Sequence, residues 1–390
     1  MLAFTASRLL SSKGIVEHSV MLVEHGRIVE IVSLAGRQLP AGIESFDFGS
    51  ALIVPGYVDL HIHGGAGSDV MDDSASALAA IERLLARHGV TSYFPTTVTA
   101  SMDNTLRALE RLATALEDAK QNKAKPSGRA IPLGIHLEGP FISHARRGVH
   151  PPADLLPPRI ETFERFWQAA RGQIRMMTIA PELDGAIELI SAASARGVCV
   201  SLGHSDAKYD TAERGIAAGA RHATHTFNAM RPLEHRDPGI LGSVLTNERV
   251  STDIIVDGIH LDPSIVKLVA HAKGHEQTVL ITDATSATGM PDGRYHLGSF
   301  EVEVKDGKCM ANGKLAGSVL TMDAAVRNLA RFADWELPDA IAAASRNPAR
   351  VAGIASKGTL EAGRDADFLV LSPTGDVMRT FVGGVECCKA

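Results

Sequence analysis

The middle of the chain alternates between short apolar runs and longer stretches in which apolar residues recur every three or four positions. A short apolar run bounded by glycine or polar residues is typical of a buried β-strand, and the longer spacing is typical of an amphipathic helix. Between residues 75 and 88, for example, Leu78, Ile81, Leu84 and Leu85 recur at helical spacing. Strand-like runs lie near residues 58–63, 91–97, 132–138, 175–180, 198–204, 222–226, 251–257 and 278–283. Eight such strands separated by helices predict an α/β fold, a closed (β/α)8 TIM-like barrel.

Both ends of the chain show a different pattern. Residues 1–55 contain short alternating strands separated by turn residues such as His25-Gly26, and residues 354–390 have a similar pattern. Alternation broken by glycine-containing turns predicts β-hairpins. We therefore expect a small β-sandwich domain built from both termini, with residues 56–353 forming the barrel.

A third alternating stretch, near residues 295–317, follows the eighth strand. Asp306 and Gly307 at its centre form a common hairpin turn pair. The pattern predicts an inserted β-hairpin, which either adds a piece of β structure or acts as a lid.

The composition excludes several classes of protein. Of the 390 residues, 45% are hydrophobic and 22% are charged, as in ordinary globular proteins. The net charge of −6 argues against a nucleic-acid binder, since the most basic stretch, residues 120–125, is short. Four cysteines without paired spacing argue against a disulfide framework, and no window reaches the roughly 18 apolar residues that span a bilayer. We expect a cytoplasmic protein that binds neither nucleic acid nor membrane.

The most informative chemical signal is the pair His61 and His63 at the end of the first barrel strand. Side chains two apart on a strand point to the same face, so both imidazoles can bind one metal ion. By itself this pair is a weak signal, because a surface strand also tolerates two such histidines.

Four further residues of metal-ligand type each follow their own strand-like run, namely Glu138, His204, His225 and Asp283. The carboxyl ends of barrel strands meet at one face, where the catalytic groups of such barrels gather. Imidazoles and carboxylates are the ligands that zinc-class ions accept. The six residues together predict a metal-dependent hydrolase. Asp283 beside the metal can take a proton from water and return it to a leaving amine, although a purely structural role, capping the turn after Thr282, is the alternative.

Longer motifs support this interpretation. They run in order from Pro55-Gly56 to Arg327-Asn328 and comprise residues 136–141 (HLEGPF), 202–205 (LGHS), 224–230 (THTFNAM), 257–260 (DGIH), 282–284 (TDA) and 315–318 (LAGS). With these motifs the chain resembles the N-acetylglucosamine-6-phosphate deacetylases of the amidohydrolase superfamily.

The resemblance implies hydrolysis of the acetamide of N-acetylglucosamine 6-phosphate to glucosamine 6-phosphate and acetate. A metal-bound hydroxide would attack the amide, since a zinc-class ion lowers the pKa of its water to about 7. Glu138 matches the position of the glutamate that bridges two metals. Some members lack the first two histidines and hold one metal, but His61 and His63 are present here, so we expect two divalent ions per chain. Zinc is the first choice, with iron, manganese or cobalt as alternatives.

The resemblance also assigns residues to the substrate. His150 matches the histidine that polarises the acetyl carbonyl, although an exposed loop histidine is the structural alternative. For the phosphate it implies the backbone N–H groups of Asn228 and Ala229, with Arg236 and His260 as side-chain donors. Similar proteins are homodimers, so Arg236 is expected to act either within its own chain or on the neighbouring chain.

One alternative function stays open at this point, and two others are disfavoured by the residues present. A deacetylase of N-acetylgalactosamine 6-phosphate, or of another acetamido sugar phosphate, would use the same ligands. A cyclic-amide hydrolase would carry a carboxylated lysine where Glu138 stands. A non-catalytic scaffold would be expected to have lost ligands, whereas all six candidates are present here.

Overall fold

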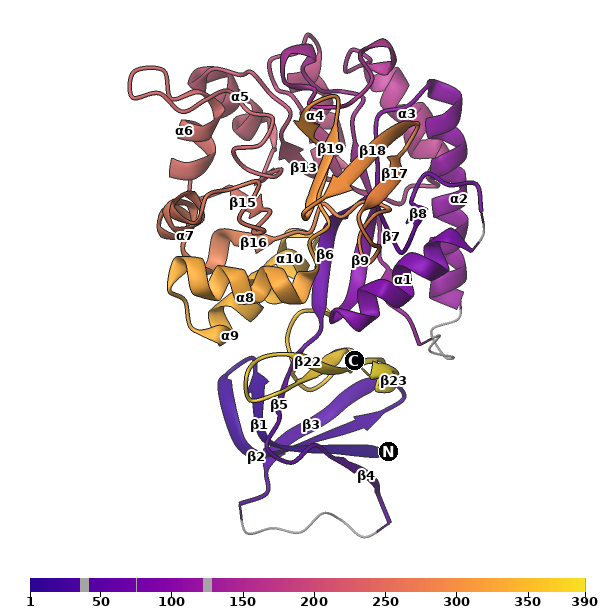
Figure 1. Ribbon diagram of the computed structural model, residues 1–390, viewed down its shortest axis with the longest axis vertical. Helices are drawn as coiled ribbons and strands as arrows, with labels where there is room; N and C mark the ends of the chain where they lie inside the picture. Colours follow the sequence, from indigo (N-terminus) through magenta and orange to yellow (C-terminus); the bar gives the residue numbers. More distant parts are fainter. Residues whose placement is uncertain (36–41, 75, 122–127, 390) are drawn as a thin grey trace.

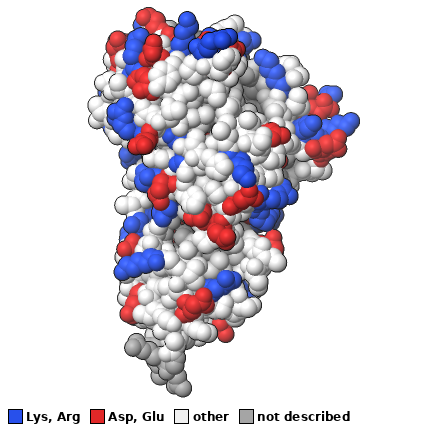
Figure 2. All heavy atoms as spheres, turned by 90° about the vertical axis from the view of Figure 1, so that its left-hand side faces the viewer, with Lys and Arg blue, Asp and Glu red and all other residues white. Residues whose placement is uncertain are grey.

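The structure is a computed structural model that describes residues 1–35, 42–74, 76–121 and 128–389. Figure 1 shows a large α/β body above a smaller β unit that contains both chain ends. Most of the basic stretch 120–125 and the expected helix start at Ala75 lie outside the described residues. Among the helices that are described, none is long and apolar enough to cross a membrane. Figure 2 shows one face of the molecule, on which cationic and anionic side chains are interspersed.

The large body is a barrel of parallel strands, as the sequence predicts. Its strands are β6 (Tyr57–Ile62), β9 (Val90–Thr97), β10 (Ile131–Pro132) with β11 (Ile135–Glu138), β12 (Ile174–Ile179), β13 (Cys199–Leu202), β14 (His222–Ala223), β15 (Ser251–Ile254) and β16 (Thr278–Leu280). β10 and β11 both pair with β9 and together occupy the third strand position. A parallel bridge between Ile62 and Ala284 joins the first strand to the segment after the eighth, which closes the barrel.

Helices surround the barrel (Figure 1). They are α1 (Ala77–Arg87), α2 (Met102–Gln121), α3 (Ile160–Ala169), α4 (Ala186–Ala195), α5 (Tyr209–Ala218), α6 (Gly239–Thr246), α7 (Pro263–Gln277), α8 (Met322–Ala333), α9 (Leu337–Ala344) and α10 (Arg346–Val351). In α1 the predicted apolar face is the buried one, with Ile81, Leu84 and Leu85 in the core. Burial of such a side chain contributes about 1.5–3 kcal/mol, so the helical spacing decides which face packs on the strands.

The termini form one mixed sheet. Its strands are β1 (Leu2–Ser11), β2 (Gly14–Glu24), β3 (Arg27–Ser33), β4 (Glu44–Asp47), β5 (Leu52–Pro55), β21 (Phe368–Leu371), β22 (Val377–Val382) and β23 (Val385–Lys389). The two ends meet where β5 pairs antiparallel with β21. Their shared core includes Phe4, whose ring contacts those of Phe368 and Phe381. Both termini therefore build a single β unit, while its exact boundaries at residues 55 and 354 stay a prediction.

The insertion after the eighth strand has more strands than the sequence predicts. Its strands are β17 (Gly293–Leu297), β18 (Phe300–Lys305), β19 (Lys308–Ala311) and β20 (Lys314–Leu315), which form an antiparallel meander. Asp306 and Gly307 make the predicted turn, both with positive φ. The expected hairpin is therefore present as β18 and β19, and tight turns at Gly298 and at Asn312-Gly313, also with positive φ, add one further strand on each side of it. A two-stranded ribbon, β7 (Gly64–Gly65) and β8 (Ser68–Asp69), follows β6.

Candidate active site

A cavity of about 300 Å³ lies where the barrel strands end. Its lining includes five of the six candidate ligands, His63, Glu138, His204, His225 and Asp283. His61, the sixth, is fully buried beside His63. The strand ends thus bring together residues that lie far apart in the sequence.

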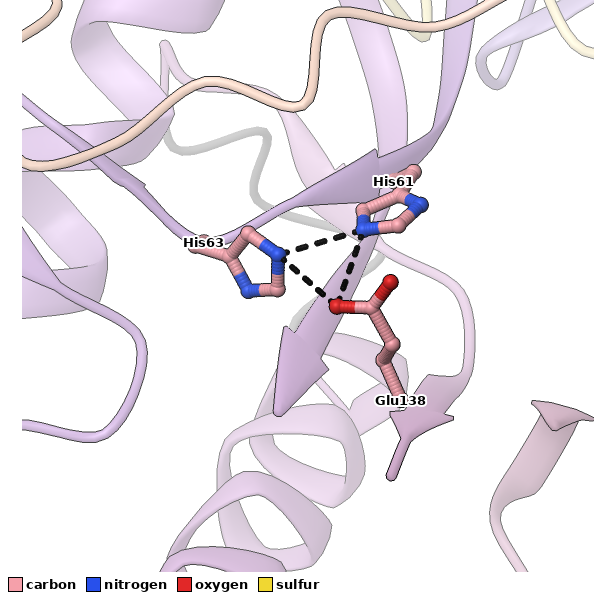
Figure 3. Close-up of side chains that lie close together, drawn as sticks. All are labelled: His61, His63 and Glu138. Atoms are coloured by element: carbon pink, nitrogen blue, oxygen red, sulfur yellow. Dashed lines mark hydrogen bonds and ion pairs between the residues drawn. The ribbon is translucent and has the colours of Figure 1, made fainter. Parts of the chain in front are cut away.

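Each oxygen of the Glu138 carboxylate lies close to a different pair of imidazoles. His61 Nε2 and His63 Nε2 lie 3.5 and 3.2 Å from Glu138 Oε2, and 3.1 Å from each other. His204 Nε2 and His225 Nε2 lie 3.3 and 3.1 Å from Glu138 Oε1, and also 3.1 Å from each other. Figure 3 shows His61 and His63 pointing toward the Glu138 carboxylate. Glu138 is thus shared by two groups that could each hold a metal ion.

Hydrogen bonds on the far side of the rings define which nitrogen faces the site. The Nδ1 atoms of His63, His204 and His225 lie 3.1, 2.9 and 3.2 Å from the backbone oxygens of Thr96, Arg146 and Asn228. A carbonyl only accepts, so each Nδ1 carries a proton, and in the neutral ring that a metal ion binds each Nε2 presents a lone pair.

These lone pairs converge on one another, which is unfavourable without a cation between them. Ligand atoms about 2.0–2.2 Å from a tetrahedral ion would be roughly 3.3–3.6 Å apart, close to the separations found here. The residues of both groups therefore fit the ligand set of a divalent metal ion. The neighbouring imidazoles also influence Glu138 itself: burial raises the pKa of its carboxyl, but His61, His204 and His225 hold that pKa well below its usual range.

Three of the candidate ligands have unusual backbones. His204, His225 and Asp283 have φ angles of 47°, 30° and 50°, a left-handed region that non-glycine residues rarely adopt. Such conformations persist only where the surrounding structure enforces them, and they gather at functional sites. In each case the sharp turn directly after a barrel strand aims the side chain into the cavity.

Asp283 is held from two sides. Its N–H donates to His61 O at 2.9 Å, and its carbonyl accepts from Ser318 N–H at 2.7 Å. Its Oδ1 lies 3.2 Å from His63 Nε2. Burial raises the pKa of the Asp283 carboxyl, but His61 and His63 outweigh burial and lower this pKa to about 2. The carboxylate is therefore ionised and able to accept a proton.

His150 has the opposite tautomer from the imidazoles around Glu138. The Thr99 backbone N–H donates to His150 Nδ1 at 3.3 Å, and the Thr99 hydroxyl lies 2.7 Å from the same atom. Because Nδ1 accepts, the proton is on Nε2, which lies 3.6 Å from Glu138 Oε2 in the same cavity lining. Burial and then His204 lower the pKa of His150 to about 3, which keeps the ring neutral. His150 is a buried donor beside the candidate ligands and not an exposed loop histidine.

The residues expected at the phosphate are divided between the cavity and the surface. Asn228, Ala229 and His260 line the cavity, and His260 Nδ1 lies 2.7 Å from Asp257 Oδ2. The Asn228 N–H donates to His225 O at 2.8 Å, so this backbone group is already engaged, whereas its buried side-chain Nδ2 has no partner among the described residues. Arg236 is exposed and is not part of the cavity lining in the described chain.

The comparisons with known proteins decide the family. The sequence profile of the amidohydrolase family matches residues 52–387. The chain belongs to the amidohydrolase family. Members of this family are metal-dependent hydrolases, so the chain is a hydrolytic enzyme, and the resemblance noted from its motifs is confirmed.

Individual relatives are similar over nearly the whole chain. An N-acetylglucosamine-6-phosphate deacetylase of Bos taurus is 38% identical, covering 98% of this chain and 94% of the relative. An N-acetylgalactosamine-6-phosphate deacetylase of Escherichia coli O157:H7 is 35% identical, covering 97% of both chains. Among solved structures, a mutant N-acetyl-D-glucosamine-6-phosphate deacetylase of Mycobacterium smegmatis in complex with N-acetyl-D-glucosamine-6-phosphate has a TM-score of 0.91 and 34% identity, covering 100% of this chain and 99% of that chain. The Thermotoga maritima N-acetylglucosamine-6-phosphate deacetylase has a TM-score of 0.87 and 29% identity, with both chains fully covered.

Two buried carboxylates that sequence reasoning did not single out support the amidohydrolase site. Asp59 accepts hydrogen bonds from His61 N–H at 3.3 Å and from the Thr282 hydroxyl at 2.6 Å, and burial raises its pKa to about 6. Asp253 lies 2.9 Å from His222 Nε2 and accepts from the His225 N–H. Each carboxylate sits inside a barrel strand and fixes the backbone of a candidate ligand. A carboxylate within the largely apolar strand β6 is a signal that could have identified Asp59, whereas β15 is polar around Asp253 and offers no such signal.

His136 and His222 are buried and hydrogen-bonded within the barrel. His136 Nδ1 lies 3.0 Å from Leu60 O, and its Nε2 lies 2.8 Å from the Thr178 hydroxyl. His222 lies between the Ser251 hydroxyl and Asp253. Both rings have their nitrogens engaged away from Glu138, which gives them a supporting role.

Proposed function

We propose that this chain hydrolyses the acetamide of N-acetylglucosamine 6-phosphate to glucosamine 6-phosphate and acetate. The observation that carries the proposal is the Glu138 carboxylate shared by two imidazole pairs, with Asp283 and His150 in the same cavity. The relatives that carry this activity in their names, and the related structure with this sugar phosphate bound, support the choice of substrate.

We infer that the site holds two divalent metal ions, zinc first and iron, manganese or cobalt as alternatives. One would be held by His61, His63, Glu138 and Asp283, and the other by Glu138, His204 and His225. When bound, such ions supply an activated water and an electrophilic partner for the amide oxygen.

The residues of the chain account for the proton transfers. Overall, water adds its oxygen to the acetyl carbon and the C–N bond breaks, so acetate leaves and the nitrogen becomes an amine. Ionised Asp283 takes the proton that water loses and donates it to the departing nitrogen. His150 donates a hydrogen bond from Nε2 to the acetyl oxygen. This bond stabilises the negative charge that develops on that oxygen, as in an oxyanion hole.

For the phosphate we propose His260, Ala229 and Asn228 within the cavity, and Arg236 from a second subunit. A backbone contact from Asn228 requires its N–H to leave His225 O, so its free side-chain amide is the better donor. Exposure of Arg236 outside the cavity lining supports a contribution across the interface of a homodimer. The arginine fork suits a phosphate because it donates two parallel bonds. The cytoplasm remains our expected location.

The alternative substrate is N-acetylgalactosamine 6-phosphate, since a relative of that name is nearly as similar as the others. The test is acetate release from both epimers, before and after chelation, with zinc, iron, manganese and cobalt added back separately. We expect the gluco epimer to have the higher kcat/KM and chelation to abolish turnover. Preference for the galacto epimer would select the alternative, and full activity without metal would contradict the proposed mechanism.

A further inference from the structure

Part of the cavity lining is apolar. Val98, Val149, Leu297 and Leu315 contribute to its lining, among otherwise polar and ionisable groups. A sugar phosphate carries hydroxyls and a dianion, and these gain nothing from an apolar wall. If the chain has the proposed function, the acyl methyl is the part of the substrate that suits such a surface.

Val98 and Val149 are neighbours in the chain of Thr99 and His150, and His150 is the residue that would bind the acyl oxygen. Val98 is followed by Thr99, which hydrogen-bonds His150 Nδ1 through both its N–H and its hydroxyl. Val149 directly precedes His150 in the chain. His150 lines the same cavity as these two valines, so a substrate whose carbonyl oxygen reaches His150 can place the neighbouring methyl group near them.

The other two wall residues come from the β17–β20 insertion and adjoin the proposed base. Leu315 is two residues before Gly317, where an added Cβ would lie 3.6 Å from Asp283 Oδ1. Leu297 precedes Gly298, whose Cα is packed so closely on Val98 that a Cβ there would clash with it. The insertion therefore meets the barrel at the wall itself, beside the reacting groups.

The position of the insertion is fixed by its own core. Leu297, Val302, Val304 and Cys309 form this core, and Val149 packs against it from the loop after β11. A pocket bounded by residues that are supported in this way has a fixed depth, because a close-packed core does not readily make room for an extra methylene.

We propose that Val98, Val149, Leu297 and Leu315 form an acyl pocket that holds the methyl of the acetyl group, and that the insertion sets the longest acyl chain the enzyme accepts. The inference rests on the proposed function and adds the residues that choose the acyl group. One methylene in a hydrophobic pocket typically changes discrimination by about 10- to 200-fold. Changes in the volume of Leu315 should therefore be visible in the choice between acetyl and propionyl substrates.

The experiment compares N-acetyl- and N-propionyl-glucosamine 6-phosphate in the full-length, metal-loaded protein. Leu315→Ala lengthens the pocket and is expected to raise the propionyl-to-acetyl ratio of kcat/KM by about tenfold or more. Leu315→Phe shortens the pocket and is expected to lower the ratio. Leu268→Ala, at an exposed position of α7, is the matched control and should leave the ratio unchanged.

The ratio is measured within one protein sample, so a partly unfolded variant does not distort it. Val149→Ala is a second enlarging variant, expected to shift the ratio in the same direction as Leu315→Ala. Equal ratios in wild type and in all wall variants would overturn the acyl pocket while acetate release continued to support the proposed function. Absence of carboxylate release from both substrates in the wild type would overturn the proposed function, and the acyl pocket with it.

Discussion

Thr99 sets the tautomer of His150. Its backbone N–H donates to His150 Nδ1 over 3.3 Å, so the proton of this ring is on Nε2, on the cavity side. In His63, His204 and His225 the roles of the two ring nitrogens are reversed, because Nδ1 donates to a backbone oxygen. The same residue type is thus held in two ways in one cavity, which suits the proposed role of His150 as hydrogen-bond donor and of the other three as metal ligands.

We predict that His150→Leu lowers kcat by about 100- to 1,000-fold, because a buried donor to the developing oxyanion is lost. His150→Gln should retain more activity, since its amide can still donate a hydrogen bond. Acetate release measured alongside metal content checks this, because the metal content of both variants should equal that of the wild type. Similar kcat values for the Leu and Gln variants would argue against the donor role.

Asp283→Asn removes the proton acceptor while keeping the shape of the side chain. We expect kcat to fall by at least about 100-fold, the usual scale for general acid–base groups. Metal analysis and acetate release are measured on the same sample. Turnover near wild type with metal fully bound would show that Asp283 is not the general base.

The shared position of Glu138 predicts an unequal effect of ligand removal on metal content. His63→Ala and His225→Ala should each reduce the bound metal from two ions per chain to about one, because each histidine belongs to one group. Glu138→Ala should reduce the content below that of either histidine variant, because both groups lose a ligand. Elemental analysis after dialysis measures all three, and one tightly held ion in the wild type would contradict the two-ion proposal.

Arg236→Ala should raise KM for the phosphorylated sugar by about tenfold and leave KM for N-acetylglucosamine nearly unchanged, since only the phosphate needs the guanidinium. Arg249→Ala, another exposed arginine in the loop before β15, is the control. An equal effect on both sugars would remove Arg236 from the phosphate site. A mixed dimer of Arg236→Ala and Asp283→Asn subunits that regains activity would support the cross-subunit contribution.

Glu82 predicts a pH-dependent stability. Burial raises the pKa of its carboxyl from 4.5 to about 7, although Arg129 and the Tyr93 hydroxyl oppose the shift. Between pH 4.5 and 7 the folded state therefore keeps this proton while the unfolded state has released it. Over this range the contribution of Glu82 to the free energy of unfolding falls as the pH rises. Glu82→Gln removes this titration, so the free energy of unfolding of the variant relative to wild type should increase between pH 5 and pH 8, by on the order of 1–3 kcal/mol, as measured by denaturant unfolding at each pH. A constant difference across this range would contradict the raised pKa.

The barrel and most of the cavity residues could be predicted from where the apolar runs end in the sequence. His61, Glu138, His204 and Asp283 each lie at or just after an apolar run, and a closed parallel barrel places such ends on one rim. The extra strands of the insertion were not predicted, because β17 and β20 have only a few residues and their turns are as short as the one at Asp306-Gly307. Strand alternation alone does not reveal how many times so short a segment reverses.

The supporting residues were harder to predict for a different reason. Asp59 and Asp253 lie within strands, where a carboxylate is usually on a solvent face, and only the closed barrel shows that they face buried backbone N–H groups. The left-handed backbones of His204, His225 and Asp283 also have no sequence signature, because glycine and asparagine are the residues that normally mark them.

The pairing of β5 with β21 bears on how this protein is made. β5 leads directly into β6, which carries His61. One edge of β5 pairs with β1, but the partner of its other edge, β21, is translated only near the end of the chain. During synthesis this second edge of β5 stays open until the C-terminal strands emerge from the ribosome, and open edges invite aggregation. Ribosome stalling or truncation before residue 368 should therefore yield insoluble protein even though every proposed metal ligand has already been translated.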